Sequence, residues 1–379
     1  MKNTMLNFYV NNKVTTEHIN IDEYDEYIQK RKNLYRQLGI PILAIKDADI
    51  LEVGSGVGHN TIPLITKWGA KHIDMLEPNP VAAEELKSNF EARAIGKETY
   101  TIFPVILEEF KGEKKYDLVI AEGYVQFAHN WKAFLNEVKK YTHENSIVIV
   151  TCADEIGLYV ERMKRVAGQY AVRDIERLED KVEHLDKLWN GQKYGENLKG
   201  MTRSSKEWIL DMIFNESSIF EHAMTMKETM DEMGDTFDIL GASQNIFTDY
   251  SWYKDLSYDY KEAYKNQYDT KKHMLLIAGE YDETIRTVAE NQKLEHTIKN
   301  VMEYVKGIER EEKICIKDFL MEIDKVSEAA DNKKIRQYNE ELKEILQLCA
   351  EKKEVEWEKY KMWKYTFGKS MQYISFERK

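Results

Sequence analysis

Cysteine and proline are scarce in this chain, and each shortage narrows the choice of fold. The 379 residues include three cysteines, Cys152, Cys315 and Cys349, which lie far apart in the sequence. An odd number of widely spaced cysteines does not build a disulfide scaffold, so we expect free thiols in a reducing compartment. The chain has only 5 prolines, which favours a helix-rich globular protein.

Long apolar runs and basic clusters are also missing. No stretch approaches the ~18 apolar residues of a membrane-spanning helix, and residues 1–7 (MKNTMLN) do not open a secretory signal peptide. We therefore expect a cytoplasmic protein that does not associate with membranes. The formal net charge is −12 and no long Lys/Arg run is present, so a nucleic-acid partner is disfavoured.

Several catalytic signatures are absent as well. The nine histidines include no H-x-x-x-H pair and the cysteines no C-x-x-C pair, so the sequence predicts no metal site. No G-x-S-x-G turn occurs, and residues 368–370 (GKS) lack the earlier glycine that a G-x-x-x-x-G-K-[ST] phosphate loop requires. The sequence thus offers no nucleophile or phosphate-binding motif of these kinds.

A glycine-rich turn stands between a predicted strand and a predicted helix. Residues 50–53 form a short apolar run, Gly54, Gly56 and Gly58 follow at alternate positions, and residues 61–68 have a helical pattern. Glycines allow positive φ and let the backbone approach a ligand closely, while the free N–H groups at a helix start favour an anionic or electron-rich group. This arrangement predicts a cofactor site.

Predicted strands and helices alternate from this turn onward. Strands are expected over residues 50–53, 73–76, 99–105, 116–121 and 146–151. Short β-branched strands separated by helices imply a parallel sheet covered on both faces, with the ends of the strands at one ligand-binding edge. Later strands are expected over residues 237–240, 274–278 and 368–376.

The chain divides into three predicted parts. Residues 1–45 include a helix over 21–38 and are interpreted as an N-terminal helical lid segment. Residues 46–280 form the α/β domain, with a helical and aromatic-rich insertion at about 157–270. Residues 281–379 form a helical extension whose apolar stripes suggest a small bundle or hairpin.

The glycine turn admits two kinds of nucleotide cofactor. A dinucleotide turn has the pattern G-x-G-x-x-G, but its third glycine would fall at His59, and Gly58 instead gives G-x-G-x-G. Glu77, which ends the second predicted strand, suits ribose hydroxyls in either case. A dinucleotide needs donors for its pyrophosphate, whereas a nucleoside with an amino-acid tail needs donors for a carboxylate and acceptors for an ammonium.

Four segments in order resemble the motifs of class I S-adenosylmethionine-dependent methyltransferases: residues 50–58 (ILEVGSGVG), 76–79 (LEPN), 107–110 (LEEF) and 116–123 (YDLVIAEG). The resemblance extends over roughly residues 45–155. It implies an α/β fold with a Rossmann-like methyltransferase domain, to which the sequence adds a largely helical C-terminal elaboration. It also implies S-adenosylmethionine as the cofactor and S-adenosylhomocysteine as the product.

The resemblance assigns roles within these segments. The glycines of the turn would approach the methionine part of the cofactor, the carboxylate after the second strand would hold the ribose, and the acidic pair after the third strand would lie near the adenine. The predicted cofactor-binding residues are Glu52, Gly54, Ser55, Gly56, Gly58, Glu77, Pro78, Asn79, Glu108, Glu109 and Glu122.

Methyl transfer is an in-line displacement at a carbon that a sulfonium already activates, so a general base is needed only when the acceptor arrives protonated. The candidate catalytic residues, Glu122 and His129, follow the fourth predicted strand. The predicted substrate-binding residues are Tyr124, Gln126, Tyr250, Trp252 and Tyr253. Glu122 also suits a structural role as a hydrogen-bonded carboxylate, and the aromatic segment suits one as a packed insertion.

We therefore predict a methyltransferase that acts on a small-molecule or sugar-type acceptor, because the chain is acidic and its extra helical mass suits an enclosed pocket. Two alternatives stay open. One is a non-catalytic protein of methyltransferase fold that binds a partner through its helical tail, and the other, less favoured, is a nicotinamide-dependent dehydrogenase. The helical C-terminal region is also where we expect a homo-oligomer contact or a partner.

Overall fold

The computed structural model describes residues 4–12, 24–123, 130–189, 204–216, 223–280, 284–310, 312 and 314–379. The chain forms two compact units. Unit 1 comprises Met1–Ala153, His222–Tyr268 and Met371–Lys379, and unit 2 comprises Asp154–Glu221 and Asp269–Ser370. Each unit is assembled from segments that are distant in the sequence. The predicted domains were instead continuous segments divided after residues 45 and 280, and these divisions stay predictions.

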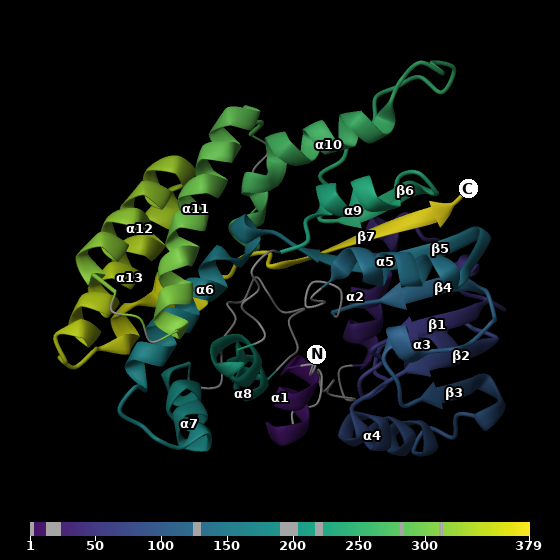
Figure 1. The fold of residues 1–379 in the computed structure, drawn as a ribbon, viewed down its shortest axis with the longest axis horizontal. Coiled ribbons are helices and arrows are strands. Elements are labelled where there is room, and N and C mark those ends of the chain that lie inside the picture. The colour runs from purple at the N-terminus through teal and green to yellow at the C-terminus, as the bar shows by residue number, and fades with distance from the viewer. Residues whose placement is uncertain are drawn as a thin grey trace. The chain divides into compact units, whose positions relative to one another are not determined.

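A seven-stranded mixed sheet forms the centre of unit 1 (Figure 1). Its strands are β1 Asp49–Val53, β2 His72–Leu76, β3 Tyr100–Phe103, β4 Tyr116–Ala121, β5 Thr142–Ala153, β6 Phe237–Ser243 and β7 Met371–Arg378. They lie in the order β3-β2-β1-β4-β5-β7-β6. The first five are parallel, and β7 is antiparallel to β5 and β6. The order reverses between β1 and β4, so the carboxyl ends of these two strands flank the crevice where such sheets bind ligands.

Strands β1 and β4 are buried along almost their whole length, as expected for strands at the centre of an α/β sheet. The helices of unit 1 are α1 Thr4–Asn12, α2 Tyr24–Gln37, α3 Thr61–Thr66, α4 Pro80–Glu91, α5 Trp131–Lys140 and α9 Met226–Met233. Helix α4 begins where local chemistry places a helix start. The side chain of Asn79 accepts a hydrogen bond from Val81 N at 3.1 Å, and Pro80 occupies the first turn. Asn79 N also donates a hydrogen bond to Glu77 Oε1 at 2.8 Å, which connects this helix start to the residue that follows β2.

The described part of unit 2 is built from helices. They are α6 Glu155–Ala171, α7 Leu178–Leu188, α8 Ser205–Trp208, η7 Ile209–Phe214, η9 Lys272–Leu275, α11 Val288–Glu309, α12 Ile316–Ala330, α13 Lys333–Ala350, η10 Trp357–Lys359 and α14 Lys361–Tyr365. Helix α10 (Tyr260–Lys271) begins in unit 1 and ends in unit 2. The predicted apolar stripes lie on α11, α12 and α13, where Leu294, Phe319 and Leu342 are fully buried. The predicted helical C-terminal elaboration is confirmed.

The α/β prediction is confirmed for the sheet, but one expected strand is wrong. Residues Lys272–Leu275 form a 3₁₀ helix, not part of a strand over 274–278. Unit 2 has no strand among its described residues that this segment could pair with, so its backbone bonds elsewhere: Leu276 N donates to His273 O and Ala278 N donates to Phe367 O. None of the helices that the structure describes is both long and apolar enough to span a bilayer.

Candidate cofactor and active site

The glycine turn joins β1 to α3 through a backbone that glycine adopts most readily. Gly54, Gly56 and Gly58 have φ angles of +76°, +55° and +83°. Gly54 N donates to Leu76 O at 2.8 Å, which extends the β1–β2 pairing into the turn. Ile62 N donates to Gly58 O at 3.0 Å and leads the chain into α3. Glycine is therefore the residue type that adopts these conformations with the least strain.

Two glycines at the ends of the central strands border open space. At Gly54, after β1, and at Gly123, after β4, no described heavy atom lies within 4 Å of the position that a Cβ would take. At Gly58 a Cβ would lie 2.8 Å from Phe90 Cε1, so this glycine allows close packing against α4. The open positions at Gly54 and Gly123 leave room for a ligand beside the reversal of strand order.

Glu77 holds the turn from the end of β2. Its Oε2 accepts a hydrogen bond from Gly56 N at 2.6 Å, and its Oε1 accepts one from Asn79 N at 2.8 Å. The side chain is buried, and that burial raises the pKa of its carboxyl above the ordinary value. Each carboxylate oxygen has a second lone pair, so Glu77 can still accept hydrogen bonds from ribose hydroxyls.

Two buried polar atoms near these elements have no hydrogen-bond partner among the described residues. They are the hydroxyl oxygen of Ser55, within the glycine turn, and Nε of Arg31, on α2. Buried donors are rarely left unpaired, so each can serve a polar ligand. The Ser55 hydroxyl, the N–H groups of the turn and the Glu77 carboxylate together fit a nucleoside with an amino-acid tail.

Arg31 joins α2 to the end of β4 through a buried ion pair with Glu122. Its Nη1 and Nη2 donate to Oε2 and Oε1 of Glu122 at 2.8 and 2.7 Å, and Nη2 also donates to Tyr35 Oη at 3.0 Å. Tyr27 Oη donates to the side-chain carbonyl of Asn60, whose amide nitrogen lies 3.4 Å from Glu122 Oε2. This hydrogen-bonded network joins α2, the start of α3 and the end of β4.

The sequence interpretation missed Arg31, Tyr27 and Asn60. A usable signal was present, since Tyr27, Arg31 and Tyr35 are spaced by four residues along the predicted lid helix and therefore share one face. What the spacing could not supply was the partner, because Glu122 lies 91 residues further along the chain.

Glu52 is a second buried carboxyl beneath the turn. Its Oε2 accepts a hydrogen bond from the Thr61 hydroxyl, and its side chain is buried in the centre of unit 1. Burial raises the pKa of this carboxyl to about 7, an effect that the Thr61 hydrogen bond partly offsets. Glu52 therefore changes protonation near neutral pH, two residues before Gly54.

The other predicted site residues lie in different places. Glu108 and Glu109 are exposed on the short helix η4 (Leu107–Glu109) that follows β3. Tyr250, Trp252 and Tyr253 are exposed on the connection between β6 and α10. The three residues predicted after Gly123 lie outside the described part of the chain: Tyr124, Gln126 and His129. The roles assigned to all of these residues stay predictions.

Within the described ranges, no cluster of His, Cys, Asp and Glu could hold a metal ion.

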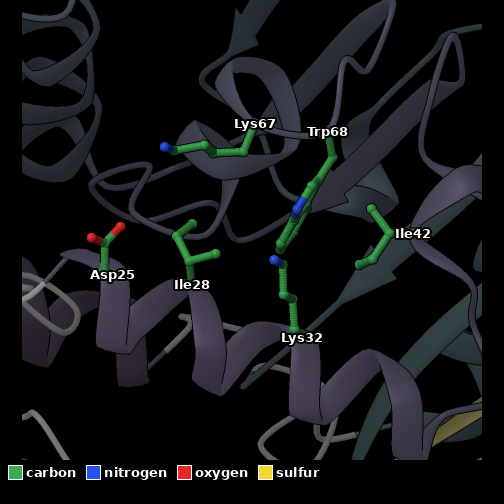
Figure 2. Close-up of a pocket in the computed structure, with 6 residues that line it drawn as sticks. All are labelled: Asp25, Ile28, Lys32, Ile42, Lys67 and Trp68. Carbon is green, nitrogen blue, oxygen red and sulfur yellow. The ribbon is translucent and has the colours of Figure 1, made fainter.

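A separate pocket of about 390 Å³ borders the neighbouring face of α2 (Figure 2). It is lined by Asp25, Ile28, Lys32, Ile42, Lys67 and Trp68. None of the predicted cofactor, catalytic or substrate residues contributes to its wall. One of its lining residues, Trp68, packs edge-on against Tyr35 with a ring-centroid distance of 5.4 Å. This pocket is therefore distinct from the space beside the glycine turn.

Comparison with known sequences identifies the character of the domain. Residues 24–197 match a protein family described as a methyltransferase domain. A curated relative, malonyl-[acyl-carrier protein] O-methyltransferase 2 of Ilyobacter polytropus, is 24% identical over 127 residues, which are 33% of this chain and 48% of that protein. The chain thus spans about half the length of this relative.

Two solved structures also resemble this chain, at low sequence identity. PKMT2 from Rickettsia typhi, in complex with AdoHcy, is 13% identical with a TM-score of 0.40, over 64% of this chain and 49% of that one. A putative S-adenosyl-L-methionine-dependent methyltransferase from Methanococcus maripaludis is 17% identical with a TM-score of 0.26, over 32% of this chain and 60% of that one.

Proposed function

Residues 24–197 of this chain belong to the class I S-adenosylmethionine-dependent methyltransferase family, and from this premise we propose that the protein transfers the methyl group of S-adenosylmethionine to a small-molecule acceptor. The observation that carries the proposal is the carboxylate of Glu77, which follows β2 and accepts a hydrogen bond from Gly56 N of the glycine turn. Family membership also favours this methyl donor over a nicotinamide for the variant G-x-G-x-G turn.

Glu77 and the residues of the glycine turn would bind different parts of the cofactor. Glu77 would accept hydrogen bonds from the ribose hydroxyls, while the Ser55 hydroxyl and the N–H groups of the turn would donate to the amino-acid tail. No described heavy atom lies within 4 Å of a Cβ placed at Gly54 or Gly123, which leaves room for a ligand beside the turn. When bound, S-adenosylmethionine supplies a methyl carbon activated by its sulfonium, so the protein has mainly to position the acceptor.

Glu122 orients groups at the end of β4 in this proposal, and it is not a free base. Both of its oxygens accept hydrogen bonds from Arg31, which balances its charge. An acceptor that needs no deprotonation by Glu122 suits this arrangement, and a carboxylate is one such oxygen nucleophile. The curated relative's description as an O-methyltransferase also supports an oxygen acceptor. A sugar hydroxyl is the second choice, because it would need a base from elsewhere.

Calorimetry followed by a transfer assay tests the proposal. The full chain should bind S-adenosylmethionine, and Glu77→Ala should lose that binding while the fold is retained. Radiolabelled methyl should then pass to small carboxylates in preference to sugars. Cofactor binding without transfer to any acceptor would favour the non-catalytic alternative. Absence of binding by the unaltered chain, or full binding by Glu77→Ala, would refute the cofactor site.

A further inference from the structure

The connection between β6 and α10 can be followed as a backbone loop in Figure 1. It carries several exposed apolar side chains. We call residues 249–258 of unit 1 the aromatic loop. Tyr250, Trp252, Tyr253 and Leu256 are 92%, 65%, 79% and 95% exposed. Burial of such side chains stabilises a fold, so four that face water in one short segment do not contribute to the stability of unit 1. Exposed large apolar side chains gathered in one segment are typical of interaction sites.

The aromatic loop has a defined shape. Asp249 Oδ1 accepts hydrogen bonds from Ser251 N and Oγ at 2.8 and 2.6 Å. Asp255 Oδ1 accepts from Ser257 N and Oγ at 3.2 and 2.6 Å. These local turns order the backbone between the aromatic residues, which lowers the entropy that a partner's binding would cost.

The base of the loop is fastened to α10. Phe247 stacks on Tyr264 with ring centroids 4.6 Å apart and an interplanar angle of 2°. Thr248 and Gln267 exchange two hydrogen bonds: Thr248 N donates to Gln267 Oε1 at 2.6 Å, and Gln267 Nε2 donates to Thr248 O at 2.8 Å. The exposed rings are therefore presented from a fixed support.

Charge and ring geometry indicate what the loop binds. The ammonium of Lys254 lies 5.0 Å from the Trp252 ring centroid and 5.5 Å from the Tyr253 ring centroid, so the two rings already hold a cation. Residues 249–259 contain three aspartates and one lysine, and all eleven residues are exposed. Such a surface repels phosphates and anionic membranes and attracts lysine and arginine side chains.

We propose that the aromatic loop docks a basic segment of a partner protein, with a lysine or arginine of the partner taking the place of Lys254 on the Trp252 and Tyr253 rings. Asp249 and Asp255 supply the complementary charge at either side. None of these residues belongs to the glycine turn or to the network around Glu122, so the proposal does not depend on cofactor binding. It is an alternative to the substrate-binding role predicted for Tyr250, Trp252 and Tyr253.

The probe is an arginine-rich dodecapeptide. The control peptide has the same sequence with each arginine replaced by neutral citrulline. Calorimetry with the full chain should show binding of the arginine peptide that weakens with salt, and at least about tenfold weaker binding of the citrulline peptide. The double variant Trp252→Ala/Tyr253→Ala leaves the net charge unchanged, and it should bind the arginine peptide about tenfold or more weakly.

Leu43→Ala is the matched control, because Leu43 is 76% exposed in unit 1 but lies on the short helix η2 (Ile42–Ala44). It should bind the peptide as the unaltered chain does, and circular dichroism should show all variants folded. The proposal is overturned by any of four results: no binding of the arginine peptide, equal binding of the citrulline peptide, unchanged binding by the double variant, or equal losses in the Leu43 control. If the chain binds phosphatidylcholine vesicles and the double variant does not, the loop is a lipid-binding site instead. If the chain self-associates and the double variant does not, the loop binds a second copy of this chain instead.

Discussion

The guanidinium of Arg31 forms a bidentate ion pair with the carboxylate of Glu122, with Nη1–Oε2 and Nη2–Oε1 distances of 2.8 and 2.7 Å. The two side chains are only 4% and 9% exposed. The contact fixes the N-terminal helix α2 against the end of β4, beside the glycine turn. It also neutralises the carboxylate that the sequence singles out as a candidate base.

Removal of Arg31 should destabilise unit 1 strongly. In Arg31→Met the Glu122 carboxylate would stay buried without its counter-charge, which costs about 3–5 kcal/mol in the free energy of unfolding. Urea denaturation of the single and double variants checks this. The double variant Arg31→Met/Glu122→Gln should recover much of the loss, because no unpaired charge is left. Equal losses in the single and double variants would show that the ion pair does not account for the effect.

Alanine substitutions should separate the roles of the glycines. Gly54, Gly58 and Gly69 all have positive φ, so each substitution should cost about 1–2 kcal/mol of backbone strain. Gly58→Ala should cost more, because its Cβ would lie 2.8 Å from Phe90 Cε1. Gly54→Ala should instead weaken S-adenosylmethionine binding, because its methyl group enters the open space beside the turn.

Gly69→Ala is the control for this series, since its Cβ would meet only Lys46 Cγ at 3.9 Å. Thermal unfolding and calorimetry measure the two effects separately. If Gly54→Ala and Gly69→Ala bind the cofactor equally well, the space at Gly54 is not part of the cofactor site.

Substitution of Glu77 by glutamine should weaken cofactor binding. The amide nitrogen cannot accept a hydrogen bond, so Gly56 N or Asn79 N would lose its acceptor and the turn would loosen. Loss of a hydrogen bond to a charged group corresponds to about 1.5–3 kcal/mol, so we expect roughly tenfold to hundredfold weaker S-adenosylmethionine binding by calorimetry. Glu84→Gln removes an exposed carboxylate of α4 and should leave the affinity unchanged. Similar affinities in both variants would contradict the assigned role of Glu77.

Glu52 should make the stability of the protein fall as pH rises toward neutrality. The carboxyl has an ordinary pKa of 4.5, and burial raises the pKa in the folded chain to about 7. Between these values the unfolded chain loses a proton that the folded chain keeps, so the free energy of unfolding falls by up to about 1.4 kcal/mol per pH unit. Above about pH 7 both states are ionised and this contribution stays constant.

Glu52→Gln should flatten that decline, as measured by urea denaturation at a series of pH values. Burial also raises the pKa of Glu161 on α6 to about 7, so Glu161→Gln serves as a parallel variant that reports on unit 2. A pH profile of Glu52→Gln that runs parallel to that of the unaltered chain would show that Glu52 does not titrate in this range.

Local features of the sequence were enough to predict the glycine turn and most strands of the sheet. The positive φ angles at Gly54, Gly56 and Gly58 depend on the residue type, and short β-branched runs depend on neighbours close in sequence. The expected strand over 274–278 failed because a strand requires a pairing partner, and the helical surroundings of this segment provide none.

By itself, then, the sequence determined the α/β character of unit 1, the position of the turn and the carboxylate at the end of β2, since each depends on short-range backbone preferences. Only the tertiary structure decided the ion pair between Arg31 and Glu122, the insertion of the C-terminal strand β7 between β5 and β6, and the exposure of the aromatic loop. These features depend on which distant segments pack together. Because many pairings satisfy the same local pattern, burial and hydrogen bonding across the whole chain select among them.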